Sequence, residues 1–311
     1  MAKYLVTGGA GFIGSHIAET LAERGEPVRV LDNLLTGKKE NLAGFLPRIE
    51  FIEGDIRDLE TCRRAVEGVE HVLHQAALPS VPRSVEDPLL TNAINITGTL
   101  NLMLAARDAG VKSFVQASSS SVYGDDPAPR KLEGREGKPL SPYAISKLVN
   151  EKYARVFHDL FGFQAVSLRY FNVFGPRQDP LSQYAAVIPL FITKVLKGES
   201  PTVFGDGRQS RDFTFVDNVV EGNILAALSG KGGGEAINVA CGERVTVNAL
   251  LDAVNEVLGK NVKPVHADPR PGDILHSTAD GRKARRVLGF EPRISFLDGL
   301  KATCAWYKQR S

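Results

Sequence analysis

Short aliphatic and β-branched runs alternate with longer stretches in which apolar residues recur every three or four positions through the first half of the chain. The short runs predict strands at Lys3–Thr7, Val28–Leu31, Ile49–Ile52, His71–His74, Phe114–Ala117 and Ala165–Leu168. The longer stretches predict helices at Phe12–Arg24, Leu59–Val66, Pro88–Ala109 and Pro142–Phe161. Such alternation is typical of an α/β fold with a doubly wound parallel sheet covered by helices on both faces.

The regular alternation stops after Asn172, where Gly, Pro and charged residues interrupt shorter segments. We expect a first domain over residues 1–172, with a return segment near 213–240, and a smaller C-terminal lobe from 173–212 and 241–311. In that lobe Gly205-Asp206-Gly207 predicts a hairpin turn, and helices are expected at Val247–Leu258 and Leu297–Lys308, the second capped by Ser295. The two parts should meet in a cleft at the carboxyl ends of the strands.

Positive and negative charges nearly balance, since 38 Lys and Arg oppose 36 Asp and Glu in 311 residues, a net charge of +2. This disfavours non-specific nucleic-acid binding, which needs an extended positive surface. The widely spaced Cys62, Cys241 and Cys304 predict reduced thiols, with neither a disulfide framework nor a metal site. No signal-peptide core follows Met1 and no apolar run is expected to span a membrane, so we expect a cytoplasmic protein without membrane contact.

A glycine-rich loop, Thr7-Gly8-Gly9-Ala10-Gly11-Phe12-Ile13-Gly14, joins the first predicted strand to the first predicted helix. Gly8 permits a tight turn, Gly11 lets a pyrophosphate approach the backbone, and Gly14 lets helix and sheet pack closely. The helix N-terminus adds free N–H groups and the positive end of its dipole. This arrangement predicts a dinucleotide site.

Asp32 ends the second predicted strand, at the distance after the glycines that a ribose-binding carboxylate requires. A carboxylate there accepts hydrogen bonds from the adenosine ribose and repels a 2′-phosphate, which favours NAD over NADP. Asp55-Ile56, after the third strand, could flank adenine; an acid before a helix is equally well an N-cap.

Tyr143 and Lys147 stand at i and i+4 in the predicted helix, so both lie on one face. A nearby ammonium, together with a positive nicotinamide ring, would lower the phenol pKa from about 10 for use as a base. A tyrosine packed in the core beside a solvated lysine is the alternative. The run Ala117–Gly124 at the end of a buried strand favours catalysis, because a hydroxyl there could hold the oxygen that Tyr143 deprotonates.

The glycine loop, Ser119 and the Tyr143–Lys147 pair resemble the extended short-chain dehydrogenase/reductase superfamily, in its sugar-nucleotide epimerase and dehydratase branch. The resemblance covers essentially the whole chain, including Arg169–Pro176 and Pro271–Asp273. It implies a Rossmann domain, NAD as cofactor and catalysis by Ser119, Tyr143 and Lys147. The implied cofactor contacts are Gly8, Gly11, Phe12, Ile13, Gly14, Asp32, Asn33, Gly37, Asp55, Ile56, Gln75, Ala76, Ala77, Asn95, Tyr143, Lys147, Tyr170 and Val173.

The reaction within the family is suggested by the two residues before Val122-Tyr123-Gly124. Dehydratases of the family carry Asp and Glu there, and nucleotide-sugar decarboxylases carry Glu at the second position, whereas this chain has Ser120 and Ser121. A serine cannot replace a carboxylate in that proton transfer. The resemblance therefore implies 4-epimerisation of a UDP-sugar: oxidation, rotation of the 4-keto intermediate, and reduction on its other face.

The resemblance also implies a substrate site, in which the two arginines hold the diphosphate and Asp273 the uridine ribose. Its members are Ser119, Ser120, Ser121, Tyr143, Asn172, Ala186, Val187, Val203, Arg211, Arg270, Asp273 and Ser277. Ser277 aligns with a wall position that is a bulky tyrosine in epimerases restricted to plain hexoses, so a serine leaves room for a 2-acetamido group. We therefore expect UDP-N-acetylglucosamine and its galactosamine epimer as substrates, with UDP-glucose/UDP-galactose and then UDP-glucuronate as alternatives.

Two other functional hypotheses remain open. One is an inactive dinucleotide-sensing protein on the same fold, and the other is a one-way dehydrogenase that uses free NAD. The predicted helices Pro88–Ala109 and Pro142–Phe161 carry apolar residues on more than one face. Family members pair such helices as a four-helix bundle, which implies a homodimer. Full burial of both helices within one subunit is the alternative.

Overall fold

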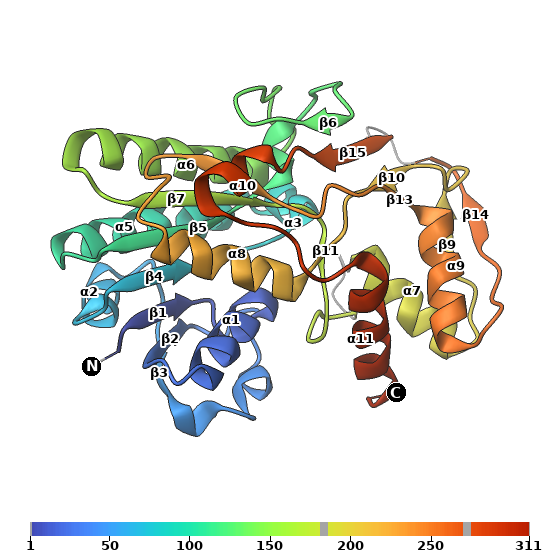
Figure 1. The fold of residues 1–311 in the computed structure, drawn as a ribbon, viewed down its shortest axis with the longest axis horizontal. Helices are drawn as coiled ribbons and strands as arrows, with labels where there is room; N and C mark the ends of the chain where they lie inside the picture. The colour runs from blue at the N-terminus through green and yellow to red at the C-terminus, as the bar shows by residue number, and fades with distance from the viewer. Residues whose placement is uncertain (1, 181–185, 270–274, 311) are drawn as a thin grey trace.

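The computed structural model describes residues 2–180, 186–269 and 275–310. Its centre is a seven-stranded sheet in the order β12-β7-β5-β4-β1-β2-β3, in which every neighbouring pair is parallel (Figure 1). The strands are β1 (Tyr4–Thr7), β2 (Val28–Asp32), β3 (Ile49–Glu53), β4 (His71–His74), β5 (Ser113–Ser119), β7 (Ala165–Tyr170) and β12 (Ala236–Val239). The predicted doubly wound α/β fold is confirmed, and β12 supplies the return segment.

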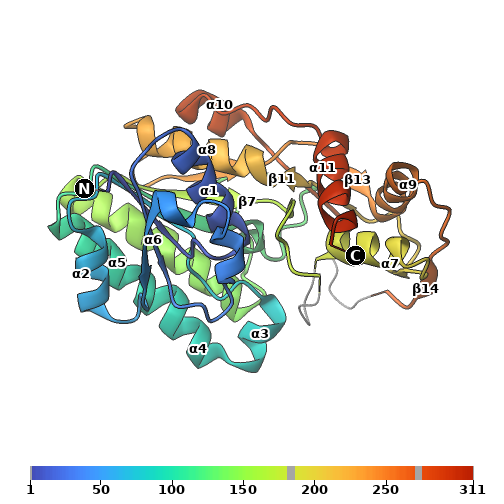
Figure 2. The same ribbon diagram turned by 90° about the horizontal axis from the view of Figure 1, so that it is seen from below.

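Helices cover both faces of this sheet (Figure 2). One face carries α1 (Phe12–Glu23), α8 (Val216–Leu228) and α10 (Arg282–Leu288). The other carries α2 (Leu59–Val66), α3 (Val81–Glu86), α4 (Pro88–Asn92), α5 (Thr99–Asp108) and α6 (Pro142–Phe161). Short 3₁₀ segments lie at Lys39–Leu42, Leu46–Arg48 and Ser120–Tyr123. Two buried hydrophobic clusters, one on each side, hold the helices to the sheet.

The helix predicted from Pro88 is continuous to Asp108 but includes a π-helical segment, Ala93–Gly98, between α4 and α5. By length and composition alone this helix could cross a membrane, so the expectation that no apolar run is long enough was wrong. Half of its most apolar window is buried inside the protein, and the core helix of a globular domain passes the same test.

The C-terminal lobe is built from α7 (Val187–Leu196), α9 (Val247–Leu258) and α11 (Phe296–Lys308) around a third cluster of buried side chains. Its strands are short: β9 (Thr202–Phe204) pairs with β14 (Val265–Ala267), and β8 (Val173–Phe174) pairs with β11 (Thr214–Phe215). A four-stranded sheet joins β13 (Val245–Thr246), β10 (Ser210–Arg211), β15 (His276–Ala279) and β6 (Arg130–Lys131).

Two details differ from the expected organisation. The predicted hairpin at Gly205-Asp206-Gly207 was wrong, because β9 before the turn and β10 after it pair with strands of two different sheets. The segment around α10, expected in the C-terminal lobe, packs Ala284, Leu288 and Phe290 into a core cluster of the first domain. The α9 prediction and the Ser295 cap of α11 are confirmed.

Candidate active site

A cavity of about 690 Å³ opens where the strands of the central sheet end. Its wall includes Gly8 after β1, Asp32 at the end of β2, Gln75 after β4 and Tyr170 at the end of β7. The cofactor contacts implied by the family resemblance gather here with one exception, Asn95. Those that line the cavity are Gly8, Gly11, Phe12, Ile13, Gly14, Asp32, Asn33, Gly37, Asp55, Ile56, Gln75, Ala76, Ala77, Tyr143, Lys147, Tyr170 and Val173.

Asn95 lies behind this wall. Its side-chain oxygen accepts the Leu78 N–H at 2.7 Å, and its amide nitrogen donates to Ser146 Oγ at 3.1 Å. These partners hold the side chain at 1% exposure. Asn95 positions Leu78, which itself lines the cavity, and a direct cofactor contact from Asn95 stays a prediction.

The glycine loop forms a cradle that side chains would fill. Gly8 has a φ of 66°, and a Cβ there would lie 2.6 Å from Ala76 N. A Cβ at Gly14 would collide with the Gly8 carbonyl. Gly11 is the N-cap of α1 and offers no side-chain cap, so the first N–H groups of the helix stay available to a ligand. The cradle and the positive end of the α1 dipole fit a diphosphate.

Asp32 is held in place beside this cradle. Its Oδ2 accepts the Ala10 N–H at 2.9 Å and its Oδ1 accepts the Leu34 N–H at 2.8 Å. Burial raises the pKa of Asp32, and these two backbone hydrogen bonds oppose the shift. Each carboxylate oxygen keeps a further acceptor position, so the residues present fit the ribose of a dinucleotide.

Asp55 is not a helix cap. The N-cap of α2 is Asp58, whose carboxylate accepts the N–H groups of Glu60 and Thr61. Asp55 instead pairs with Arg57 at 2.7 Å and accepts a hydrogen bond from Asn33 Nδ2 at 2.8 Å. The Arg57 hydrogen bond is the main reason that the pKa of Asp55 falls to about 2. The Asp55 side chain therefore stays charged and fixed at the Asp32 end of the cavity.

Tyr143 and Lys147 line the cavity on its β5–β7 side, across β4 and β1 from Asp32. Helix α6 begins here because Ser141 caps the Ala144 N–H at 3.1 Å. Lys147 Nζ lies 5.9 Å from the centroid of the Tyr143 ring and donates to the Ala117 carbonyl at 2.7 Å. Ser119 lies near enough to the Tyr143 hydroxyl to lower its pKa. The three residues expected to be catalytic are thus brought together.

Burial shifts the pKa of both members of this pair. It raises the pKa of Tyr143, and Ser119 opposes the rise. It lowers the pKa of Lys147 from 10.5 to about 8, against the opposing charge of Glu151. The expected lowering of the phenol pKa by Lys147 together with the nicotinamide ring stays a prediction.

The expected substrate residues are brought together in part. Arg211 in β10 and Ser277 in β15 are register partners, and Ser277 is 8% exposed. Asn172 has a φ of 35° and donates to the Asp212 carbonyl at 2.9 Å. Ser277 is small and therefore takes little of the space beside Arg211.

The other expected substrate residues fall into three groups. Ala186 lines the cavity, and Val187 begins α7 behind it. Val203 is 1% exposed in the core of the C-terminal lobe, so its backbone alone could reach a ligand. Ser120 and Ser121 follow Ser119 in a 3₁₀ turn. Arg270 and Asp273 lie outside the described residues.

Arg83 is a cavity residue that the sequence reasoning missed, together with Pro79 and Ser80. It lies on α3, next to Ser84, whose Oγ accepts the Tyr143 N–H at 3.1 Å. Within the described ranges the Arg83 guanidinium has no hydrogen-bond or ion-pair partner. The serine and proline that open α3 are a helix-start pattern that could have revealed this element.

The other charged residues of the wall are engaged. Lys38 and Asp179 pair at 2.8 Å, and Arg177 pairs with Glu19. Asp32, Asp55 and Lys147 have the partners given above. Within the described part of the lining, the carboxylates are therefore all held by cations or backbone N–H groups, and none is a spare acid for Tyr143.

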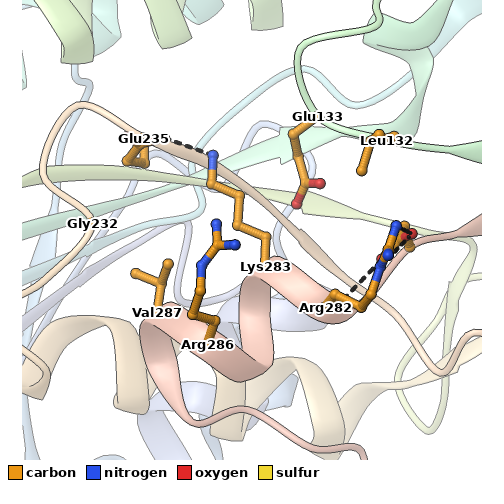
Figure 3. Close-up of a pocket in the computed structure, with 9 residues that line it drawn as sticks. Leu132, Glu133, Gly232, Glu235, Arg282, Lys283, Arg286 and Val287 are labelled. Atoms are coloured by element: carbon orange, nitrogen blue, oxygen red, sulfur yellow. Dashed lines mark hydrogen bonds and ion pairs between the residues drawn. The ribbon is translucent and has the colours of Figure 1, made fainter.

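A second hollow of about 610 Å³ lies beside α10 (Figure 3). Its charges largely satisfy one another: Lys283 pairs with Glu235 at 2.6 Å, and Arg282 with Asp280 at 2.7 Å. No group of three or more His, Cys, Asp or Glu side chains in the described ranges is arranged for a metal ion. We therefore place the chemistry in the first cavity.

The chain matches the model of the NAD dependent epimerase/dehydratase family over residues 4–240. It is 40% identical over 309 residues to a putative UDP-glucose 4-epimerase of Methanocaldococcus jannaschii, with 99% of each chain covered. A solved UDP-N-acetylglucosamine 4-epimerase from Methanobrevibacter ruminantium, in complex with UDP-N-acetylmuramic acid, has a TM-score of 0.95 and 41% identity, with 100% of this chain and 99% of that chain covered.

The UDP-glucose 4-epimerase of Thermus thermophilus, solved in complex with NAD, has a TM-score of 0.88 and 41% identity, with 99% of each chain covered. These similarities agree with the glycine cradle, the buried Asp32 and the Tyr143–Lys147 pair described above. NAD is the cofactor that this cavity fits. The chain belongs to the NAD-dependent epimerase/dehydratase family.

Proposed function

We propose that this protein is an isomerase, a NAD-dependent UDP-sugar 4-epimerase whose preferred substrates are UDP-N-acetylglucosamine and UDP-N-acetylgalactosamine. The observation that carries the reaction type is the Tyr143–Lys147 pair in a cavity whose described carboxylates are all engaged elsewhere. Similarity to 4-epimerases over nearly the whole chain supports the same reaction.

Each residue of the pair has a defined task. The Tyr143 oxygen takes the proton from the sugar 4-hydroxyl, and Ser119 holds that same oxygen through its hydroxyl. The Lys147 ammonium, anchored on the Ala117 carbonyl, provides positive charge beside the phenol. NAD, held by the glycine loop and Asp32, would supply the hydride acceptor and donor that the exchange at C4 requires. Tyr143 then returns its proton, so no cofactor is consumed.

The preference for acetamido sugars rests on Ser277. Its register partner is Arg211, the expected diphosphate ligand, so Ser277 lies one strand away from that group. A serine leaves volume in the wall that a bulky side chain would fill. We infer that this volume takes the 2-acetamido group.

The test is direct. Purified protein incubated with UDP-N-acetylglucosamine, without added NAD, should form the C4 epimer, detected by anion-exchange chromatography. Turnover of UDP-glucose but not of the acetamido sugar would contradict the substrate assignment and would still support the 4-epimerase reaction. Accumulation of NADH when NAD is supplied would indicate a one-way dehydrogenase. No turnover of any UDP-sugar would favour a dinucleotide-sensing protein.

One observation favours a second candidate, UDP-glucuronate 4-epimerase. Arg83 lines the cavity near the start of α6, and its guanidinium has no partner in the described ranges. A guanidinium matches a carboxylate geometrically. Faster epimerisation of UDP-glucuronate than of UDP-N-acetylglucosamine would establish this candidate. Arg83→Gln should then lower the ratio of the two kcat/KM values by about tenfold or more.

A further inference from the structure

A buried ion cluster lies directly behind Tyr143 and Lys147. Its centre is Glu151, on α6, which is 6% exposed. Arg169 in β7 donates to Glu151 twice, from Nε to Oε1 at 2.8 Å and from Nη2 to Oε2 at 2.7 Å. Ser118 at the end of β5 donates its hydroxyl to Glu151 Oε1 at 2.6 Å. One carboxylate therefore ties α6 to two strands of the central sheet.

Arg169 is itself strongly held. Its guanidinium reaches a second carboxylate, Glu136, at 2.6 Å and lies 4.9 Å from the centroid of the Tyr123 ring. The Arg169 side chain is 2% exposed. Isolated buried charges are costly, whereas a bidentate pair with further hydrogen bonds is tolerated and rigid. The arrangement of Glu151 is therefore imposed from the sheet side.

The cluster is connected to the residues that touch the substrate. Tyr143, Lys147 and Glu151 follow one another at four-residue spacing, so they share one face of α6. Lys147 Nζ donates to the Ala117 carbonyl, and the Glu151 carboxylate accepts from the Ser118 hydroxyl. Both hydrogen bonds therefore hold the end of β5 immediately before Ser119. A change at Glu151 would loosen the ammonium and the Ser119 hydroxyl together.

We propose that Glu151, held by Arg169, is a positioning residue for the Tyr143–Lys147 pair: it fixes the end of β5 against α6 and supplies the negative charge that faces the buried lysine ammonium. This inference rests on the proposed function. Neither Glu151 nor Arg169 lines the cavity, so both would act through the residues that do.

The charges around Lys147 favour this role. Glu151 raises the pKa of Lys147 against the effect of burial. His74 on β4 also interacts with Lys147 but is neutral at working pH, since burial lowers its pKa to about 3. Tyr170 on β7 has its pKa raised by burial and stays neutral. Glu151 is thus the negative charge on which the protonated lysine depends.

Removing the charge of Glu151 should change how the activity depends on pH. The lysine acts in its charged form, which is lost as the pH rises through its pKa of about 8. Removing the Glu151 charge lowers that pKa further, so Glu151→Gln should move the alkaline limb of kcat/KM to lower pH by about one unit. Glu151→Asp keeps the charge and should leave the limb near its wild-type position, even where a longer reach to Arg169 reduces kcat.

The decisive measurement is the titration of the Lys147 Cε resonance by NMR, assigned by its disappearance in Lys147→Met. Its midpoint should fall in Glu151→Gln and stay in place in Glu60→Gln, a matched change at an exposed position on α2. If Glu151→Gln does not fold, Glu136→Gln removes a less buried carboxylate of the same cluster and should lower the midpoint by a smaller amount.

An unchanged Lys147 midpoint in a folded Glu151→Gln or Glu136→Gln variant would overturn the proposal, even if the variant were slow or unstable. Failure of the proposed function is distinguishable: the wild type would then turn over no UDP-sugar, while the NMR midpoints would still respond to the substitutions.

Discussion

In the proposed mechanism, proton transfer depends on a single phenol, that of Tyr143. Tyr143→Phe removes the phenol hydroxyl and leaves the ring in place. The expected result is a fall in kcat of about 10²- to 10⁴-fold, the usual contribution of a positioned acid or base. Initial rates of epimer formation would measure it. Tyr153→Phe, a half-buried tyrosine on the same helix that does not line the cavity, is the matched control and should retain activity.

Substrate size can also be tested at a single residue. Ser277→Tyr should lower kcat/KM for UDP-N-acetylglucosamine relative to UDP-glucose by about 10- to 100-fold, because an added ring occupies the volume assigned to the acetamido group. A substrate panel on both proteins gives the ratio. Ser277→Ala preserves the small side chain and should keep the wild-type ratio; an equal loss for both sugars in Ser277→Tyr would contradict the pocket assignment.

Single residues also show where sequence reasoning reached its limit. Asp32, Tyr143 and Lys147 were predictable because strand ends and helix spacing place them at one edge of the sheet. Glu151 and Arg169 were not singled out as site residues, since a charged residue on a helix is normally solvated and their pairing depends on how α6 packs on β7. The contact of Asn95 with the Leu78 N–H was not foreseen, because an amide could serve a ligand or a backbone and the sequence does not distinguish the two.

Elements with strong local signals were predicted closely. Helix α6 begins at Pro142 after the Ser141 cap and ends at Phe161 before Gly162, whose φ is 66°. The two-residue strands of the C-terminal lobe carry no such signal. Ser210–Arg211 pairs with Val245–Thr246 and with β15, both distant in the sequence, so neither periodicity nor turn chemistry could reveal these pairings.

The contact between β1, β4 and α5 makes folding sensitive to acid. His74 Nδ1 lies 2.6 Å from Thr7 Oγ1, and its Nε2 lies 2.9 Å from Thr99 Oγ1. Thr99 donates its own proton to the Asn95 carbonyl at 2.6 Å, so Nε2 is a donor of the His74 ring. Burial lowers the pKa of His74 to about 3.

The unfolded chain binds a proton on this histidine below about pH 6.5, whereas the folded chain does not. Stability is therefore complete above pH 6.5 and is lost as the pH falls toward 3. From pH 7 to pH 5 the free energy of unfolding should drop by about 2 kcal/mol from His74 alone. Urea unfolding at both pH values measures the drop. His74→Gln should reduce the difference between them; an equal difference in the variant would show that other groups cause it.

At the scale of the whole molecule, an apolar surface crosses α3, α4 and α6, and we propose that it is the contact between two copies in a homodimer. Val85 and Leu89 are 63% and 82% exposed, and Val156 and Leu160 on one face of α6 are 47% and 69% exposed. α3 and α4 both pack against α6, so these side chains share one side of the protein. Monomers rarely leave such patches uncovered.

A two-fold axis through this surface would set the helices of each subunit against those of the other, as in a four-helix bundle. Leu160→Glu places a charge in that contact, so sedimentation velocity should show a dimer for the wild type and a shift toward monomer for the variant. Leu228→Glu changes an equally apolar, 56% exposed residue on α8, across the sheet, and should remain dimeric.

Because the surface lies on α6, which also carries Tyr143 and Glu151, loss of the dimer should lower activity together with thermal stability. A monomeric wild type would instead leave this apolar face to a different partner.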